Sequence, residues 1–153
     1  FHQAKVRSMH NNIREDISQL EHQQSGTIAF RLTKKHNFRR RDFRKGIVAL
    51  SEKMYKNKNL FECYEFTANI KILQHNTTIK TGYTPVIHYG PISQCATIYI
   101  PPEYGKSLKR NSKASVSFKF VFRPEFVYPG LMLFFRDGNT KGIGFVTSIK
   151  CIK

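Results

Sequence analysis

The stretch FFRDGNTKGIGFV, residues 134–146, carries apolar residues on both sides of a short polar tip that contains glycine. Glycine adopts positive φ values at no steric cost, and Asp and Asn tolerate the left-handed region better than most residues. An Asp-Gly pair between apolar runs is among the strongest short signals for a β-hairpin. The stretch therefore predicts two antiparallel strands, 131–136 and 143–149, joined through the polar tip.

The hydrophobic pattern outside this hairpin is also mainly that of β-strands. Short apolar runs and period-two alternation of apolar and polar residues are typical of strands that bury one face. The further segments with such a pattern are 27–32, 46–50, 64–73, 95–100 and 115–122. Many short strands punctuated by Pro and Gly predict an all-β sandwich or barrel. The strict alternation of Phe residues at 118–122 predicts a core face in preference to a surface for stacking on bases.

One segment, 12–23, fits two interpretations. Its apolar residues recur at spacings of three and four, as on one face of a helix. It could equally form two strand pieces around a polar loop. We leave both open at this point.

The composition changes at 51–62, which is polar, rich in Lys and Asn, and without a sustained period. We place a linker at 51–60, with a truncated β-domain at 1–50 and a complete one at 61–153. Because the sequence begins with Phe1 instead of Met, we interpret it as a fragment of a longer chain. Any targeting signal or upstream domain would then lie outside it.

The chain is strongly basic. It has 26 Lys and Arg against 10 Asp and Glu, a formal net charge of +16 over 153 residues. Such a field attracts polyanions, with nucleic acid as the first candidate and an acidic membrane surface behind it. No Asp or Glu occurs between Glu65 and Glu103, so one surface is expected to have few local counter-charges. This distribution favours a binding face.

Several classes of site are missing at the level of motifs. The three cysteines form no Cys-x-x-Cys pair, which indicates a reducing compartment, and we expect a cytoplasmic protein. No apolar run approaches the roughly 18 residues of a membrane-spanning helix, and we expect no membrane partner. No motif positions a catalytic nucleophile, a carboxylate pair or metal ligands. We therefore expect this chain to have neither an active site nor a metal site of its own.

Three stretches, in order along the chain, resemble one family. Residues 76–98, NTTIKTGYTPVIHYGPISQCATI, are similar to the opening of the third domain of translational GTPases related to elongation factors Tu and 1-alpha. Residues 133–149 resemble the closing hairpin of that domain, and residues 5–50 resemble the second half of the second domain. Residues 87–94 match the Val-His-x-Gly-x-Ile-x-Gln pattern of the GTP-binding protein 1 branch, with Ile at the first position.

The resemblance implies a Greek-key β-barrel of the third-domain type, preceded by part of a second-domain barrel. It also implies a GTPase domain N-terminal to this chain, which would hold GTP and Mg²⁺ and make the parent protein a GTP hydrolase. This chain has no Gly-x-x-x-x-Gly-Lys-Ser/Thr loop, so we expect it to hold no cofactor itself. Its implied role is to hold tRNA or tRNA-like RNA against the GTPase domain.

The resemblance also implies where RNA would bind, because the closing hairpin of the family approaches the backbone of the tRNA T-stem. The candidate residues at the tip are Asp137, Gly138, Asn139, Thr140 and Lys141. His88, Gln94 and Lys80 are candidates for additional hydrogen bonds and charge. The alternatives are a tight turn without a partner, a half-buried structural His88 and an edge polar Gln94.

The densest basic run, 31–46, offers a second candidate site. Its candidate residues are Lys34, Lys35, Arg39, Arg40, Arg41 and Arg44. Such loops bind phosphate without sequence preference, although a merely solvated basic loop is the alternative. A smaller cluster comprises Lys106, Lys109, Arg110 and Lys113.

Two other functions remain open at the level of sequence. The barrel could dock a protein partner, such as a ribosomal or RNA-decay component, or bind structured RNA in general. Salt-sensitive binding would indicate phosphate contacts, whereas an exposed apolar patch would indicate a protein interface.

Overall fold

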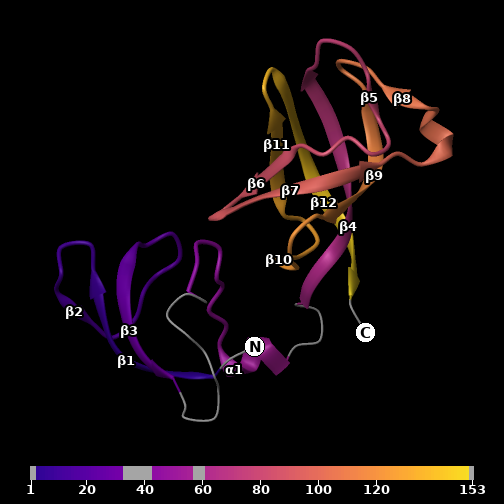
Figure 1. The fold of residues 1–153 in the computed structure, drawn as a ribbon. Coiled ribbons are helices and arrows are strands. Elements are labelled where there is room, and N and C mark those ends of the chain that lie inside the picture. The colour runs from indigo at the N-terminus through magenta and orange to yellow at the C-terminus, as the bar shows by residue number, and fades with distance from the viewer. Residues whose placement is uncertain (1–2, 33–42, 57–60, 152–153) are drawn as a thin grey trace. The chain divides into compact units, whose positions relative to one another are not determined.

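The computed structural model describes residues 3–32, 43–56 and 61–151, and the chain divides into two compact units, Phe1–Arg44 and Lys45–Lys153. Both units are built from antiparallel β-strands (Figure 1). The regular helices of the described residues are α1 (Glu52–Lys56) and a 3-10 helix, η2 (Pro102–Tyr104). No helix in the described part of the chain is long and apolar enough to cross a membrane.

The first unit contains a three-stranded sheet in the order β2-β1-β3. Its strands are β1 (Ala4–Asn11), β2 (Asp16–Ile17) and β3 (Gly26–Leu32). The predicted strand 27–32 is confirmed as β3. The helical interpretation of 12–23 is wrong, because the Asn11 side-chain oxygen accepts hydrogen bonds from the backbone N–H groups of Ile13 (3.1 Å) and Glu15 (2.9 Å). An Asn that bonds to its own backbone two and four residues on favours a turn over a helix.

The second unit is a closed six-stranded barrel in which every neighbouring pair is antiparallel. The strands follow the order β4-β12-β11-β6-β7-β9, and β9 pairs back with β4 to complete the ring. The barrel strands are β4 (Phe61–Gln74), β6 (Val86–Tyr89), β7 (Ile92–Tyr99), β9 (Lys113–Phe120), β11 (Met132–Asp137) and β12 (Thr140–Cys151). Strand β10 (Glu125–Val127) pairs with the start of β4, and β5 (Ile79–Lys80) pairs with β8 (Ser107–Leu108). The predicted all-β barrel is confirmed.

The barrel interior is filled by inward-facing side chains, which alternate with outward-facing ones along each strand. Phe66 on β4 packs against Phe118 and Phe120 on β9, with ring centroids 5.3 Å apart in both pairs. All three rings are buried, so the prediction of a core face for these phenylalanines is confirmed. The predicted alternation reaches too far at one end, because β9 ends at Phe120 and Phe122 is 70% exposed.

Of the remaining strand predictions, two are confirmed and one is wrong. Predicted strands 64–73 and 95–100 are confirmed as parts of β4 and β7. The apolar run 46–50 is not a strand: residues 47–50 have no regular structure, and Ile47 and Val48 are 46% and 41% exposed. An apolar run without alternation is a weak strand signal, since it cannot be told from other buried segments by period.

The predicted closing hairpin is confirmed, but its strands extend further into the tip than predicted: β11 reaches Asp137 and β12 begins at Thr140, which leaves a two-residue turn at Gly138 and Asn139. Gly138 has a φ of 53°, and a positive φ at the first central position is required by both favoured types of hairpin turn. On β12, Gly142 lies opposite Phe135 of β11. The missing side chain at Gly142 provides the space that the Phe135 ring occupies, so the Gly-x-Gly pattern serves packing.

Candidate nucleic-acid interface

Two exposed cations flank the base of the tip turn. Arg136 on β11 and Lys141 on β12 are directly opposite each other, one residue pair below the pair formed by Asp137 and Thr140. Neither cation has an ion pair with an acidic side chain of the described residues. We call Arg136, Lys141 and the turn residues Gly138 and Asn139 the tip face. This face combines two free positive charges with a glycine-containing backbone that another molecule can approach closely.

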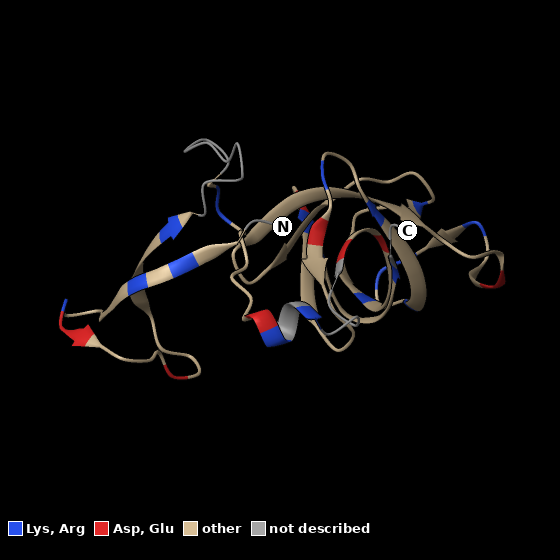
Figure 2. Ribbon diagram, turned by 90° about the horizontal axis from the view of Figure 1, so that it is seen from below, with Lys and Arg blue, Asp and Glu red and all other residues tan. Residues whose placement is uncertain are grey.

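The same row of the outer surface continues across four strands. Arg136 pairs with Val86 of β6 on one side, and Lys141 pairs with Gln74 of β4 on the other. Since side chains at these register positions point to one side of the sheet, the two cations project from the middle of the row. Figure 2 shows Lys and Arg spread over the strands and loops of the barrel, with few Asp and Glu among them.

A network of side chains fixes the base of the hairpin. The Thr140 hydroxyl lies 2.6 Å from His75 Nδ1, and His75 Nε2 lies 3.3 Å from the Thr77 hydroxyl. The Tyr83 hydroxyl donates a hydrogen bond of 3.0 Å to Asp137 Oδ2, and its ring lies edge-on to His75 with centroids 5.7 Å apart. We call these five residues the hairpin-base network. It joins the loop after β4 and the segment before β6 to the hairpin, and so holds the tip face in place.

Tyr83 makes this network sensitive to alkaline pH. Burial raises the pKa of the Tyr83 hydroxyl, the hydrogen bond with Thr140 opposes this, and the Asp137 carboxylate adds to the rise. A raised pKa in the folded state favours the protonated form, so the stabilising contribution is fully present below about pH 10, the ordinary tyrosine value. It is lost as the pH rises through the higher folded-state pKa.

Replacing Tyr83→Phe is therefore expected to remove one phenolate titration that occurs above pH 10. The variant should also lose about 1 kcal/mol of unfolding free energy at neutral pH, the usual contribution of one hydrogen bond. The difference between the phenolate absorbance titrations of wild type and variant isolates this one tyrosine. A difference curve with its midpoint at or below pH 10 would show that the hydroxyl is not held as described.

Most of the candidate tip residues are accessible. Asp137, Gly138, Asn139 and Lys141 are exposed, although the Asp137 carboxylate is already an acceptor for Tyr83. Lys80 is also exposed, and its carbonyl oxygen accepts a hydrogen bond from the backbone N–H of Tyr83. The structure therefore brings Lys80 to the segment that anchors the hairpin.

Thr140 differs from its neighbours in the tip. It is 6% exposed, and its hydroxyl is engaged by His75. Thr140 is followed at every second position of β12 by the buried Gly142 and Gly144, so its side chain lies on the interior face of the strand. We therefore treat Thr140 as a positioning residue and leave it out of the proposed contact surface.

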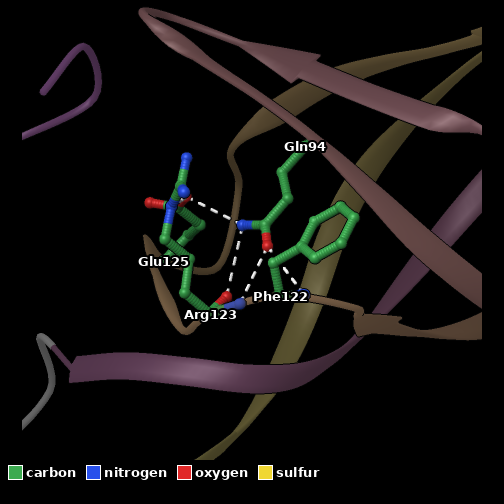
Figure 3. Close-up of polar contacts among 4 residues, drawn as sticks. All are labelled: Gln94, Phe122, Arg123 and Glu125. Atoms are coloured by element: carbon green, nitrogen blue, oxygen red, sulfur yellow. Dashed lines mark hydrogen bonds and ion pairs between the residues drawn. The ribbon is translucent and has the colours of Figure 1, made fainter.

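Gln94, a candidate for RNA contact, is an interior residue, and the prediction for it needs correction (Figure 3). It is 4% exposed, and its side-chain oxygen accepts hydrogen bonds from the backbone N–H groups of Phe122 (3.1 Å) and Arg123 (2.9 Å). Its side-chain nitrogen donates to Glu125 Oε1 at 2.8 Å. With both polar atoms engaged inside the protein, Gln94 ties the loop after β9 to β7 and has no atom to offer RNA.

His88 lies on β6 opposite Phe134 of β11 and is half-buried. Its Nε2 atom is buried without a hydrogen-bond partner among the described residues. A buried ring nitrogen cannot reach a phosphate or ribose, so the Nε2 atom of His88 does not contribute to the tip face.

The basic run at 31–46 falls largely outside the described residues. Lys34, Lys35, Arg39, Arg40 and Arg41 lie there, and their predicted phosphate contacts stay predictions. Arg44 is described and half-buried. It belongs to the first unit, whereas the tip face belongs to the second.

Four residues of this site escaped the sequence analysis: Arg136, His75, Thr77 and Tyr83. Arg136 could have been found from the hairpin alone, because a two-residue turn that pairs 137 with 140 must also pair 136 with 141. His75 and Tyr83 act across sequence separations of 65 and 54 residues, which no local pattern reveals.

Three known proteins are similar to this chain over more than half of its length. GTP-binding protein 1 of Xenopus laevis is 32% identical over 149 residues, which is 97% of this chain and 21% of that protein. GTP-binding protein 2 of Mus musculus is 38% identical over 116 residues, covering 76% of this chain and 18% of that protein. Elongation factor 1-alpha of Desulfurococcus mucosus is 39% identical over 105 residues, covering 56% of this chain and 24% of that protein.

The chain thus spans about a fifth of the length of these relatives. No family model matches the sequence.

Proposed function

We propose that the barrel of this chain is an RNA-contact domain. The chain is a homologue of part of GTP-binding proteins 1 and 2 and of elongation factor 1-alpha, which is consistent with a domain of a translational GTPase. In this proposal the barrel holds tRNA or tRNA-like RNA beside a GTPase domain of the same protein. That domain, outside this chain, would bind GTP and Mg²⁺ and hydrolyse GTP. The protein would work in the cytoplasm, where tRNA is used.

The observation that carries the proposal is the pair of exposed cations at the tip. Arg136 and Lys141 lie side by side on the outer face, next to a turn whose Gly138 exposes its backbone. A-form RNA presents its phosphates and 2′-hydroxyls across a wide, shallow minor groove, so proteins recognise it through shape and backbone contacts. Two adjacent cations beside a small protruding turn match such a surface, and they need no base-specific contact.

The rigidity of the hairpin supports the same proposal. The hairpin-base network fixes the turn from two other segments of the barrel. A contact surface held in place before binding loses less side-chain and loop entropy when the complex forms. Asp137 fits this proposal, because its carboxylate accepts a hydrogen bond from the Tyr83 hydroxyl. This hydrogen bond partly offsets the repulsion between the carboxylate and an RNA phosphate.

The proposal is tested by titrating the 153-residue chain into fluorescently labelled, deacylated tRNA at several salt concentrations. The variant Arg136→Gln/Lys141→Gln should bind more weakly, with the slope of log K against log salt reduced by about 1.5 to 2 for two lost phosphate contacts. The matched control Lys53→Gln/Lys119→Gln removes two exposed charges away from the tip and should bind with a smaller loss. If both variants lose affinity equally, binding depends on net charge and the tip face is not the site.

A second candidate function has an observation of its own. Three apolar side chains on the outer face of the same hairpin are exposed, Met132 (44%), Phe134 (47%) and Phe145 (51%). Exposed apolar patches of this kind are typical of protein-docking surfaces. A ribosomal or RNA-decay protein partner would bind there with little salt dependence, whereas RNA binding would weaken steeply with salt.

A further inference from the structure

A groove of about 530 Å³ lies on the outer face of the barrel, over β12, β4 and β9. Two cross-strand rows form its floor. The first row contains Ile143, Lys71 and Lys113, and the second contains Phe145, Asn69 and Ser115. Tyr104, from the 3-10 helix η2, also lines the groove. We call this the lysine groove, and it shares no residue with the tip face.

The two lysines are the unusual feature of the groove. Lys71 and Lys113 face each other directly across β4 and β9, and both are exposed. Like charges directly opposite one another destabilise a sheet. Neither lysine has an ion pair with an acidic side chain in the part of the chain that the structure describes. An anion bound over the pair would turn this repulsion into two charge-assisted contacts.

The groove also offers aromatic surface and neutral hydrogen-bonding groups. Tyr104 is 38% exposed and Phe145 is 51% exposed, so both rings present a face or edge to a ligand. The Asn69 amide and the Ser115 hydroxyl share the second row with Phe145, next to the row that contains the two lysines. The volume of the groove is within the range of small-molecule sites, about 300 to 1,000 Å³.

We propose that the lysine groove binds one unpaired nucleotide of single-stranded RNA. Its phosphate lies over Lys71 and Lys113, its base stacks on the exposed rings of Tyr104 and Phe145, and Asn69 and Ser115 hydrogen-bond to the ribose or base. Single-strand binding proteins combine a cationic surface for the backbone with aromatic side chains for stacking. Duplex RNA would leave the aromatic rings unused, because its bases are already stacked.

This proposal rests on the proposed function only for the class of ligand, RNA, and assigns a different surface of the barrel. An RNA whose helical part lies on the tip face would place a loop or a free end in the lysine groove. The two surfaces meet along β12, where Lys141 of the tip face and Ile143 of the groove are two residues apart on the same side of the sheet.

The test uses the ¹⁵N-labelled 153-residue chain and the uridine tetranucleotide rU4, which is short enough to report a single groove. Titration should shift the backbone amide resonances of residues 69–71, 113–115 and 143–145. Lys71→Gln/Lys113→Gln should weaken rU4 binding about 100-fold, because it removes two charge-assisted contacts that each contribute about tenfold or more. Tyr104→Ala or Phe145→Ala should weaken it about 5- to 150-fold, and Tyr104→Phe should retain it.

The control Lys53→Gln/Lys119→Gln should bind rU4 as wild type does, and the amide spectrum of each variant reports whether it is folded. Shifts confined to residues outside the groove would overturn the proposal. So would an unchanged affinity in both aromatic variants. A tetraglutamate peptide that shifts the same amides with equal affinity would show instead that the groove takes an acidic peptide.

The two proposals can fail separately. If rU4 does not bind but Arg136→Gln/Lys141→Gln loses tRNA affinity, the groove assignment is wrong and the tip face stands. If rU4 binds at the groove while the tip variant binds tRNA normally, the reverse holds.

Discussion

Gly142→Ala is expected to lower the free energy of unfolding of the barrel by about 3 kcal/mol, at the upper end of the usual cost of overpacking a core. A Cβ atom at this position would lie 1.9 Å from Phe135 Cζ and 2.3 and 2.6 Å from its two Cε atoms. Phe135 is 1% exposed and packs on Phe118 with ring centroids 6.1 Å apart. Since the ring is enclosed, it cannot swing away from the added methyl group without disturbing the core.

Urea denaturation of the 153-residue chain, followed by tyrosine fluorescence, measures this effect. The matched control is Gly138→Ala, where nothing lies within 4 Å of the added Cβ and only the positive φ of 53° opposes the substitution. That control should cost about 1 to 2 kcal/mol. Adding Phe135→Leu to Gly142→Ala should recover part of the loss by making room. A cost for Gly142→Ala no greater than that of the control would contradict the packing described.

The second large effect is expected at Gln94. Gln94→Leu has a similar volume but removes the acceptor of the Phe122 and Arg123 backbone N–H groups and the donor to Glu125. Glu125 is 2% exposed and keeps its contact with Arg123 Nε at 3.2 Å, so the network is damaged but not abolished. Leaving buried polar groups unpaired costs about 1 to 3 kcal/mol each. We expect a loss of about 3 kcal/mol in unfolding free energy.

The variant Gln94→Glu distinguishes the contribution of the Gln94 hydrogen bonds to stability from the contribution of its side-chain packing. It places a second carboxyl group where an amide now lies 2.8 Å from Glu125 Oε1. Two carboxylates this close raise the pKa of one of them in the folded state, so the stabilising contribution of its protonated form is lost as the pH rises. The variant should therefore be less stable than wild type at pH 7, with a smaller difference near pH 4. A difference that does not change with pH would show that Gln94 does not contact Glu125 as described.

The parts of the fold that sequence predicts well are those specified locally. The closing hairpin follows from Asp137-Gly138 between apolar runs, and β4 follows from a long alternation that puts Phe66 and Ile72 on one face. Where long-range contacts decide, the prediction fails. Gln94 reads as an edge polar residue because its partners lie 28 to 31 residues further on, and no local pattern shows that they enclose it.

The candidate site shows the same division. Lys141, Gly138 and Asn139 follow from the turn itself, and the structure adds Arg136 through strand register. The lysine groove could not be foreseen, because Lys71 and Lys113 are distant in sequence and meet only when β9 pairs with β4. The helical interpretation of 12–23 failed for a different reason. The Asn11 side chain forms hydrogen bonds that stabilise a turn, and the spacing of apolar residues does not reveal such a turn.

Site-specific photo-cross-linking tests the central proposal, contact of RNA with the tip face, most directly. A benzophenone amino acid is introduced at Asn139, in the exposed turn, and separately at Tyr128. Tyr128 is 42% exposed and lies before the first residue of β11, at the end of that strand away from the turn. Each protein is irradiated with labelled, deacylated tRNA at low and at high salt. We expect the Asn139 protein to cross-link tRNA at low salt, with a yield that falls at high salt, and the Tyr128 protein to give little product. Cross-linking from Tyr128 alone, or from neither position while tRNA still binds, would contradict the account.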